Sequence, residues 1–234
     1  TYNIDEHQSD NHYNCPLVAY YPEVIAGNSD LNDVKFVYPY LSFDNPLSFC
    51  KAIANHFKKI GITFKKHDLH KAFTKGEENY IRFKNMLLKK QEETIAYARS
   101  NHYPIALLCG RPYHLDPLIN HQINHLLTQL GYVVISEESV PHDGSYKVNV
   151  LNQWTYHARL YRAAYYASQN RDVELIQLVS FGCGIDAITT DEVKEILRAN
   201  NHFYTQIKID EIDNLGAVKI RLRSMKETTK RGKK

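Results

Sequence analysis

The sequence predicts an α/β fold with a Rossmann-like, doubly wound parallel sheet of about four strands in the C-terminal part of the chain. After residue 100, four short apolar runs alternate with helical patterns, which is the element order of βαβ units. The runs are almost continuously apolar, as strands are when both faces of a parallel sheet are covered. A chain of 234 residues, 43% of them hydrophobic, is long enough to bury such a core.

The elements of this sheet follow one another in a regular order. Strands are predicted over residues 104–110, 132–140, 173–182 and 202–210. Helices are predicted over residues 116–131, 153–169, 190–200 and 215–225. Asp116 with Pro117 is a start signal for the first helix, and Thr189 with Glu192 has the spacing of a capping box for the third. These signals predict where each strand gives way to a helix.

The first hundred residues have a different pattern. Residues 16–25 and 34–41 are short apolar runs broken by prolines, which predicts strands or extended segments at a sheet edge. We therefore divide the chain into an N-terminal α/β portion with connecting helices, a Rossmann-like domain and a basic tail, with the boundaries 1–100, 101–228 and 229–234.

Two helices are predicted within the N-terminal portion. Asn45 followed by Pro46 starts the first, and Gly61 ends it. Apolar residues recur at helical spacing along it, which places Cys50 on the core-facing side as a structural residue. A longer, charged and amphipathic connecting helix is predicted over about 67–100.

Composition narrows the class of protein. The net charge is only +3, so no nucleic-acid partner is predicted. No apolar stretch approaches the roughly 18 residues needed to cross a bilayer, and the N-terminus lacks the apolar core of a signal peptide. The four cysteines are Cys15, Cys50, Cys109 and Cys183, far apart and without a CxxC pair, which favours a reducing compartment. We therefore expect a cytoplasmic protein without a membrane partner.

Polar residues gather in the four strand-to-helix loops of the predicted sheet. Ligands of open parallel sheets bind beyond the carboxyl ends of the strands, where these loops meet. One rim is therefore expected to hold Arg111, His114, Asp116, Glu137, Glu138, Cys183, Asp186, Asp210, Glu211 and Asp213. Individual members also have structural interpretations: Asp116 as a helix cap, Arg111 as the partner of a nearby acid, His114 as a solvated side chain, and Asp186 as a stabiliser of a turn or helix start.

Cys183 is the most unusual of these residues. Gly182 and Gly184 flank it and leave backbone amides exposed, a setting that suits a thiolate or a cluster sulfur. A catalytic nucleophile would need a base, and His114 is the one candidate on the rim. A zinc site is an alternative to a cluster or a nucleophile at Cys183, but the sequence has no pair of ligands at the spacing typical of zinc sites. The sequence contains neither a P-loop nor a GxGxxG motif, so the usual phosphate loops are missing.

Five long segments together carry a resemblance to a known family. They are NCPLVAYYPEVI (14–25), LLCGRPYHLDPLINHQI (107–123), NQWTYHARLYRAAYY (152–166), IQLVSFGCGIDAITTDEVKEIL (176–197) and YTQIKIDEIDNLGAVKIRLRS (204–224). The chain resembles the dehydratase-like region of acyl-CoA dehydratase activase-related proteins, which are relatives of the 2-hydroxyacyl-CoA dehydratase subunits and their ATP-dependent activator. The resemblance implies a piece of a larger multidomain protein, preceded by activase domains with an actin-like ATPase fold.

The resemblance also implies a 4Fe-4S cluster in the intact protein, held by cysteines. By position, Cys15 and Cys183 match two ligands, and a further cysteine is expected upstream of residue 1. Arg111, His114 and Asp186 would lie close to this cofactor. Cys109 stands where the family pattern has a small residue such as alanine, which indicates a core substitution, with a spare ligand as the alternative.

Two functions from different classes follow. In the first, the module binds the cluster and takes part in ATP-driven, low-potential electron transfer to a substrate such as an acyl-CoA, with activase domains of the same or a partner chain supplying the electrons. An enzyme of this kind would be an iron–sulfur lyase or reductase. In the second, it is a regulatory or assembly module that binds a partner domain or small ligand at the sheet edge without redox chemistry.

Overall fold

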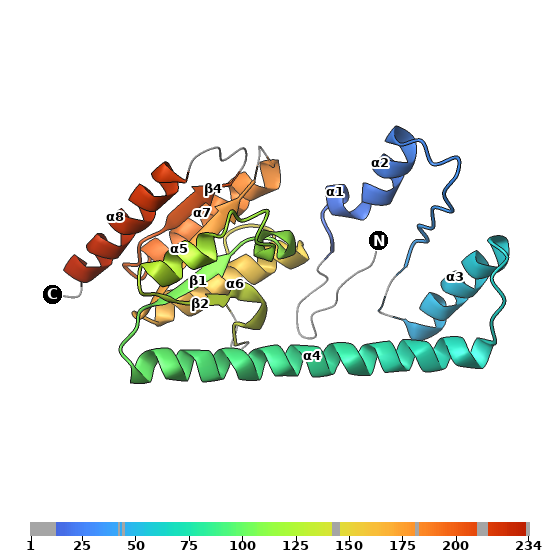
Figure 1. Cartoon of the computed structure of the whole chain (residues 1–234), viewed down its shortest axis with the longest axis horizontal. Helices are drawn as coiled ribbons and strands as arrows, with labels where there is room; N and C mark the ends of the chain where they lie inside the picture. Colours follow the sequence, from blue (N-terminus) through green and yellow to red (C-terminus); the bar gives the residue numbers. More distant parts are fainter. Residues whose placement is uncertain are drawn as a thin grey trace. The chain divides into compact units, whose positions relative to one another are not determined.

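The computed structural model describes residues 13–41, 43, 45–141, 146–180, 183–209 and 215–232. The chain divides into two compact units. The first comprises Thr1–Phe83 and Asn152–Ala158, and the second comprises Lys84–Leu151 and Arg159–Lys234. Figure 1 labels the helices and strands.

A four-stranded, all-parallel sheet forms the centre of the second unit. Its strands are β1 (Ile105–Cys109), β2 (Val133–Ser136), β3 (Val173–Val179) and β4 (Thr205–Lys208), in the spatial order β2-β1-β3-β4. Every predicted strand is present within its predicted range, and the sequence-based fold class is confirmed. The reversal of strand order on either side of β1 and β3 is the arrangement in which open sheets bind ligands.

Helices cover both faces of this sheet. On one face, the C-terminal end of α4 (Lys66–Ser100), α6 (Thr155–Gln169) and α7 (Gly184–Arg198) pack on one set of strand residues. On the other, α5 (Ile123–Gln129) and α8 (Gly216–Gly232) pack on the alternate set (Figure 1). In β1 the alternation is direct, because Leu107 joins the first cluster and Leu108 the second. Period-two alternation on a sheet buried on both sides explains the unbroken apolar runs in the sequence.

Two predicted helix starts in this unit are wrong. Helix α7 begins at Gly184 with Cys183 as its N-cap residue, so Thr189 lies inside the helix and its hydroxyl donates to the carbonyl of Ile185 at 2.9 Å. Threonine can make this bond to the residue four positions earlier instead of capping a helix. Glu192, the other half of the predicted capping box, accepts a hydrogen bond from the backbone N–H of Asn149 at 2.8 Å.

The helix predicted from Asp116 begins later. Asp116 accepts a hydrogen bond from the backbone N–H of Leu118 at 2.8 Å and so forms a local turn. His121 and Gln122 then adopt left-handed backbone angles, with φ of 50° and 59°, and α5 starts only at Ile123. Left-handed residues cannot continue a right-handed helix, which is why the two segments separate.

The prediction of strands or extended segments in the first unit is wrong for residues 16–25, and for residues 34–41 no strand is present. Residues of the first apolar run form the helices α1 (Pro16–Ala19) and α2 (Tyr21–Asn28), and residues 35–41 are in neither helix nor strand. Pro16 and Pro22 lie in the first turns of α1 and α2, where proline is favoured. Among the described residues of this unit, pairing of the β type is limited to an isolated parallel bridge between Tyr13 and Trp154.

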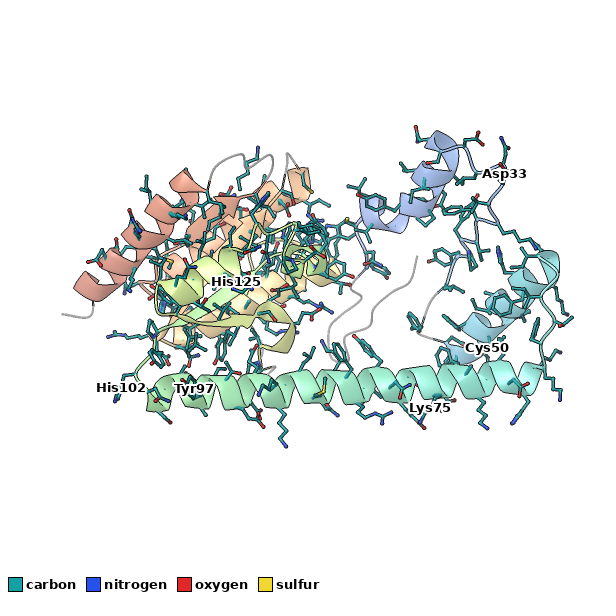
Figure 2. All side chains as sticks on the ribbon, in the orientation of Figure 1. Asp33, Cys50, Lys75, Tyr97, His102 and His125 are labelled. Atoms are coloured by element: carbon teal, nitrogen blue, oxygen red, sulfur yellow. The ribbon has the colours of Figure 1, made fainter. Side chains whose placement is uncertain are left out.

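The other predictions for this region are confirmed. Helix α3 (Pro46–Lys59) starts at Asn45, whose side-chain oxygen accepts a hydrogen bond from the backbone N–H of Ser48 at 3.0 Å. Gly61 follows it with a φ of 76°, a conformation that favours glycine. Cys50 is buried on α3 (Figure 2), and burial raises the pKa of its thiol, as expected for a structural residue.

The long connecting helix is present as α4, which has 35 residues. It buries Gln91, Ile95 and Ala98, the stripe that covers the sheet of the second unit. None of the helices in the described part of the chain is long and apolar enough to cross a membrane. Helix α8 continues beyond Met225 into the predicted basic tail, of which Lys233 and Lys234 lie outside the described residues. The three-part domain division stays a prediction.

Candidate functional site

Three of the predicted site residues meet at the carboxyl edge of the sheet. Arg111 follows β1, whereas Cys183 and Asp186 come from the start of α7, directly after β3. The Nη2 atom of Arg111 donates to Oδ1 of Asp186 at 2.6 Å and to Sγ of Cys183 at 3.3 Å. One nitrogen thus contacts both the carboxylate and the sulfur, and these three residues lie together within the second unit.

Arg111 is almost completely removed from solvent, with 6% of its surface exposed. Burial alone lowers the pKa of Arg111, but the hydrogen bond and charge of Asp186 outweigh it, helped by Tyr113 and Cys183, and the net shift of this pKa is upward. The guanidinium is therefore a permanent positive charge in a poorly hydrated place, where electrostatic interactions are stronger than in water.

His114 lies beside this contact in the short helix η1 (Pro112–Leu115) and is buried. Its Nδ1 accepts a hydrogen bond from the backbone N–H of Arg111 at 2.9 Å, and its Nε2 lies 2.8 Å from Oγ of Ser180. Because an amide N–H can only donate, Nδ1 carries no proton, and the proton of the neutral ring is on Nε2, directed at Ser180. Both ring nitrogens are thus engaged by Arg111 and Ser180 rather than by Cys183, which argues against a Cys183–His114 nucleophile pair.

Gly110 makes this arrangement possible. A Cβ atom at this position would overlap Nδ1 of His114, so only glycine allows the imidazole to fold back on the backbone of β1. The one sequence signal for the close approach of His114 to the backbone is the position of Gly110 directly after an apolar run.

Glu137 is a member of the predicted rim that we did not select as a site residue. It follows β2 at the start of η2 (Glu137–Ser139), is 2% exposed, and accepts a hydrogen bond from the backbone N–H of Gly110. Burial, and secondarily the charge of Glu138, raises its pKa from 4.5 to about 8, although backbone hydrogen bonds and Arg159 oppose this shift. At neutral pH this carboxyl group is therefore mostly protonated, next to the loop that carries Arg111.

The remaining cysteines have other environments. Cys109 is 1% exposed in the core, and burial, followed by the charge of Glu137, raises its pKa well above the ordinary value; both observations support a core thiol. Cys15 is 4% exposed and belongs to the first unit, so its convergence with Cys183 stays a prediction. Of the other predicted rim residues, Asp116 is exposed, and Asp210, Glu211 and Asp213 lie outside the described residues, as does Gly182, the glycine that precedes Cys183.

Among the described residues of this edge, Cys183 is the one cysteine, whereas a 4Fe-4S cluster is held by several cysteine thiolates. Within the described ranges, no group of three or more His, Cys, Asp or Glu side chains is placed to hold a metal ion. Cys183 alone combines partial exposure with a cationic hydrogen-bond donor, as cluster thiolates often do.

A parallel sheet with helices on both faces defines an α/β protein, and its buried charged residues gather at the edge where open parallel sheets bind their ligands. The family model of the CoA enzyme activase uncharacterised domain (DUF2229) matches residues 1–140, more than half of the chain. The chain therefore belongs to this family. The comparisons with curated proteins and with solved structures gave no match. Cys15, Arg111 and His114 lie within the matched residues, whereas Cys183 and Asp186 lie beyond them.

These environments predict different thiol reactivities. In the native protein, Cys183 is expected to react with a maleimide or disulfide reagent much faster than Cys50 and Cys109, because it is partly exposed while they are buried. Mass spectrometry of labelled peptides over time measures this difference. Cys183→Ser should remove the fast phase, and denaturant should expose the other thiols. Equal labelling of Cys109 and Cys183 in the native protein would contradict the assigned environments.

Proposed function

We propose that the chain is the electron-carrying module of a CoA enzyme activase-related protein, and that Cys183 is a ligand of its 4Fe-4S cluster. The contact between the Arg111 guanidinium and Sγ of Cys183 carries the proposal. A cluster and its thiolates bear net negative charge, and hydrogen bonds to the sulfurs are a principal way in which proteins stabilise it. When bound, the cluster would supply one-electron transfer at low potential.

The neighbouring residues have supporting roles in this proposal. Asp186 holds the guanidinium of Arg111 beside the sulfur, and His114 holds the backbone from which Arg111 extends. Cys15 is the second proposed ligand. ATP-driven activase domains of the same or a partner chain would deliver the electrons, and a small substrate such as an acyl-CoA would receive them.

Anaerobic reconstitution of the intact protein with iron and sulfide tests the proposal. We expect the wild-type protein to retain both elements after desalting, and we expect Cys183→Ser and Cys15→Ser each to lose most of them. Cys50→Ala and Cys109→Ala are the matched controls, because both thiols are buried in the core and their loss should leave the iron content unchanged. Absence of iron from the wild-type protein, or its full retention in Cys183→Ser, would contradict the proposal.

A second candidate function, an assembly module without redox chemistry, is favoured by the surface of the first unit. Helices α1 and α2 have no buried residue. The two helices and Tyr20 between them expose several large apolar side chains, namely Leu17, Tyr20, Tyr21, Val24 and Ile25. Exposed apolar patches of this kind mark protein interaction sites. Binding of the purified activase ATPase domain, weakened by Leu17→Ser with Tyr20→Ser but unaffected by Cys183→Ser, would favour this candidate over the first.

A further inference from the structure

We infer that the second unit carries a separate ligand site at the end of α7, which binds the nucleoside diphosphate group of a free nucleotide or of a larger cofactor. The site is a cavity of about 570 Å³, lined by Lys194, Arg198, Asn201, His202, Phe203 and Tyr204. This volume is typical of small-molecule sites, which occupy roughly 300–1,000 Å³. The cavity lies where the chain leaves α7 and enters β4, at the opposite edge of the sheet from Cys183, so the inference is independent of the proposed cluster.

The way in which α7 ends gives the cavity its shape. Asn201 has a left-handed φ of 60°, and its backbone N–H donates to the carbonyl of Arg198 at 3.0 Å. The backbone N–H of His202 donates to the carbonyl of Leu197 at 2.9 Å, and these two bonds together form a Schellman motif. The motif turns the chain back at the end of the helix, so that residues 202–204 line the same cavity as the last turns of α7.

The charged part of the cavity is basic. Lys194 and Arg198 are four residues apart on α7 and therefore lie on the same side of the helix. His202 is a third basic side chain, and none of the described lining residues is acidic. Glu195 contacts Arg198 at 3.9 Å, but both side chains are more than 60% exposed. An ion pair of this kind is weak, so a phosphate group can displace the carboxylate from the guanidinium.

The rest of the cavity is mainly aromatic. Tyr204 is held in place, because its hydroxyl donates to Oε1 of Gln177 at 3.0 Å and its side chain packs against the core that α7 covers. Phe203 is 52% exposed, so much of its ring is accessible to a ligand. Nucleobases stack on aromatic rings, and arginine and lysine bind phosphate. A nucleotide uses both parts of the cavity, whereas an inorganic anion or an apolar ligand uses one.

Isothermal titration calorimetry of the full 234-residue chain with ADP tests the inference. The wild type is expected to bind ADP saturably at one site. Arg198→Ala is expected to weaken this binding about tenfold, because it removes a charged hydrogen-bond donor to phosphate. Lys90→Ala is the matched control, since Lys90 is also exposed and paired with a glutamate three residues further on, at 3.5 Å, and its loss should leave the affinity unchanged.

Phe203→Ala separates recognition of the base from recognition of the phosphates. It is expected to weaken ADP binding about tenfold, through lost stacking, and to leave the weaker binding of inorganic pyrophosphate unchanged. Arg198→Ala should weaken the binding of both ligands. Phe83→Ala is the matched control, because Phe83 is 48% exposed on α4, and it should change neither. Pyrophosphate binding as tight as that of ADP would contradict the role of Phe203.

Coenzyme A, which contains an ADP group, distinguishes the two sources of the ligand. Tighter binding of coenzyme A than of ADP would indicate a larger cofactor, and tighter binding of ADP a free nucleotide. Absence of saturable binding of both, or wild-type affinity for ADP in Arg198→Ala and Phe203→Ala with the fold retained by circular dichroism, would overturn the inference. These measurements need no iron, so a failed cluster reconstitution would count against the proposed function alone.

Discussion

Gly110→Ala is expected to lower the free energy of unfolding by about 3–5 kcal/mol. The added methyl group would overlap the imidazole of His114, which is buried and cannot move without disrupting its neighbours. Overpacking of this kind costs about 1–3 kcal/mol, and the bonds of His114 to Arg111 and Ser180 contribute about 1 kcal/mol each. Urea unfolding followed by circular dichroism measures the change.

Gly184→Ala is the matched control for this prediction. Gly184 is the first residue of α7, and a Cβ atom there would meet nothing within 4 Å. Alanine should therefore change stability by less than about 1 kcal/mol, in the favourable direction if helix propensity dominates. If Gly110→Ala were as stable as Gly184→Ala, the packing of His114 against β1 would be wrong.

Glu137→Gln is expected to remove a large pH dependence of stability. Because the pKa of Glu137 is 4.5 in the ordinary state and about 8 in the fold, the folded protein holds a proton that the unfolded chain releases. Its contribution is fully present below pH 4.5 and is lost as the pH rises to and through about 8. At about 1.4 kcal/mol for each pH unit, the total loss amounts to several kcal/mol.

Urea unfolding of wild type and Glu137→Gln at several pH values between 5 and 9 tests this prediction. The amide cannot ionise, so the variant should show a flatter profile and should exceed the stability of the wild type above about pH 8. Glu138→Gln, which changes the adjacent and more exposed carboxylate, should retain the pH dependence but end it at a somewhat lower pH, because the charge of Glu138 contributes to the raised pKa of Glu137. Parallel profiles for wild type and Glu137→Gln would show that Glu137 does not hold the proton.

The sheet could be predicted from the sequence because its signal is local. A strand buried on both faces is predominantly apolar, and β1 and β3 are buried along their entire lengths. Glu174 and Gln177 are the polar exceptions in β3. The gathering of Arg111, Cys183 and Asp186 followed from topology, since strand ends of a parallel sheet share one edge. Helix starts were less accurate, because a turn signal such as Thr189 can be used inside a helix.

The rest of the site depends on contacts between residues distant in sequence. No sequence pattern marks Ser180 as a site residue. Its contact with His114 depends on the fold, in which Ser180, at the end of β3, places its Oγ 2.8 Å from Nε2 of His114. Glu137 stood on the predicted rim, but its raised pKa results from burial, which no local pattern encodes. Pro16 and Pro22, which suggested a sheet edge in the first unit, lie in the first turns of α1 and α2, since both contexts suit proline.

The most direct measurement of the central claim is the low-temperature EPR spectrum of the dithionite-reduced, reconstituted intact protein, recorded side by side for wild type, Cys183→Ser and Cys109→Ala. If Cys183 is a cluster ligand, wild type and Cys109→Ala should show the same signal of a reduced 4Fe-4S cluster, and Cys183→Ser should lose it or change its shape. An unchanged signal in Cys183→Ser would contradict the assignment of Cys183 as a ligand.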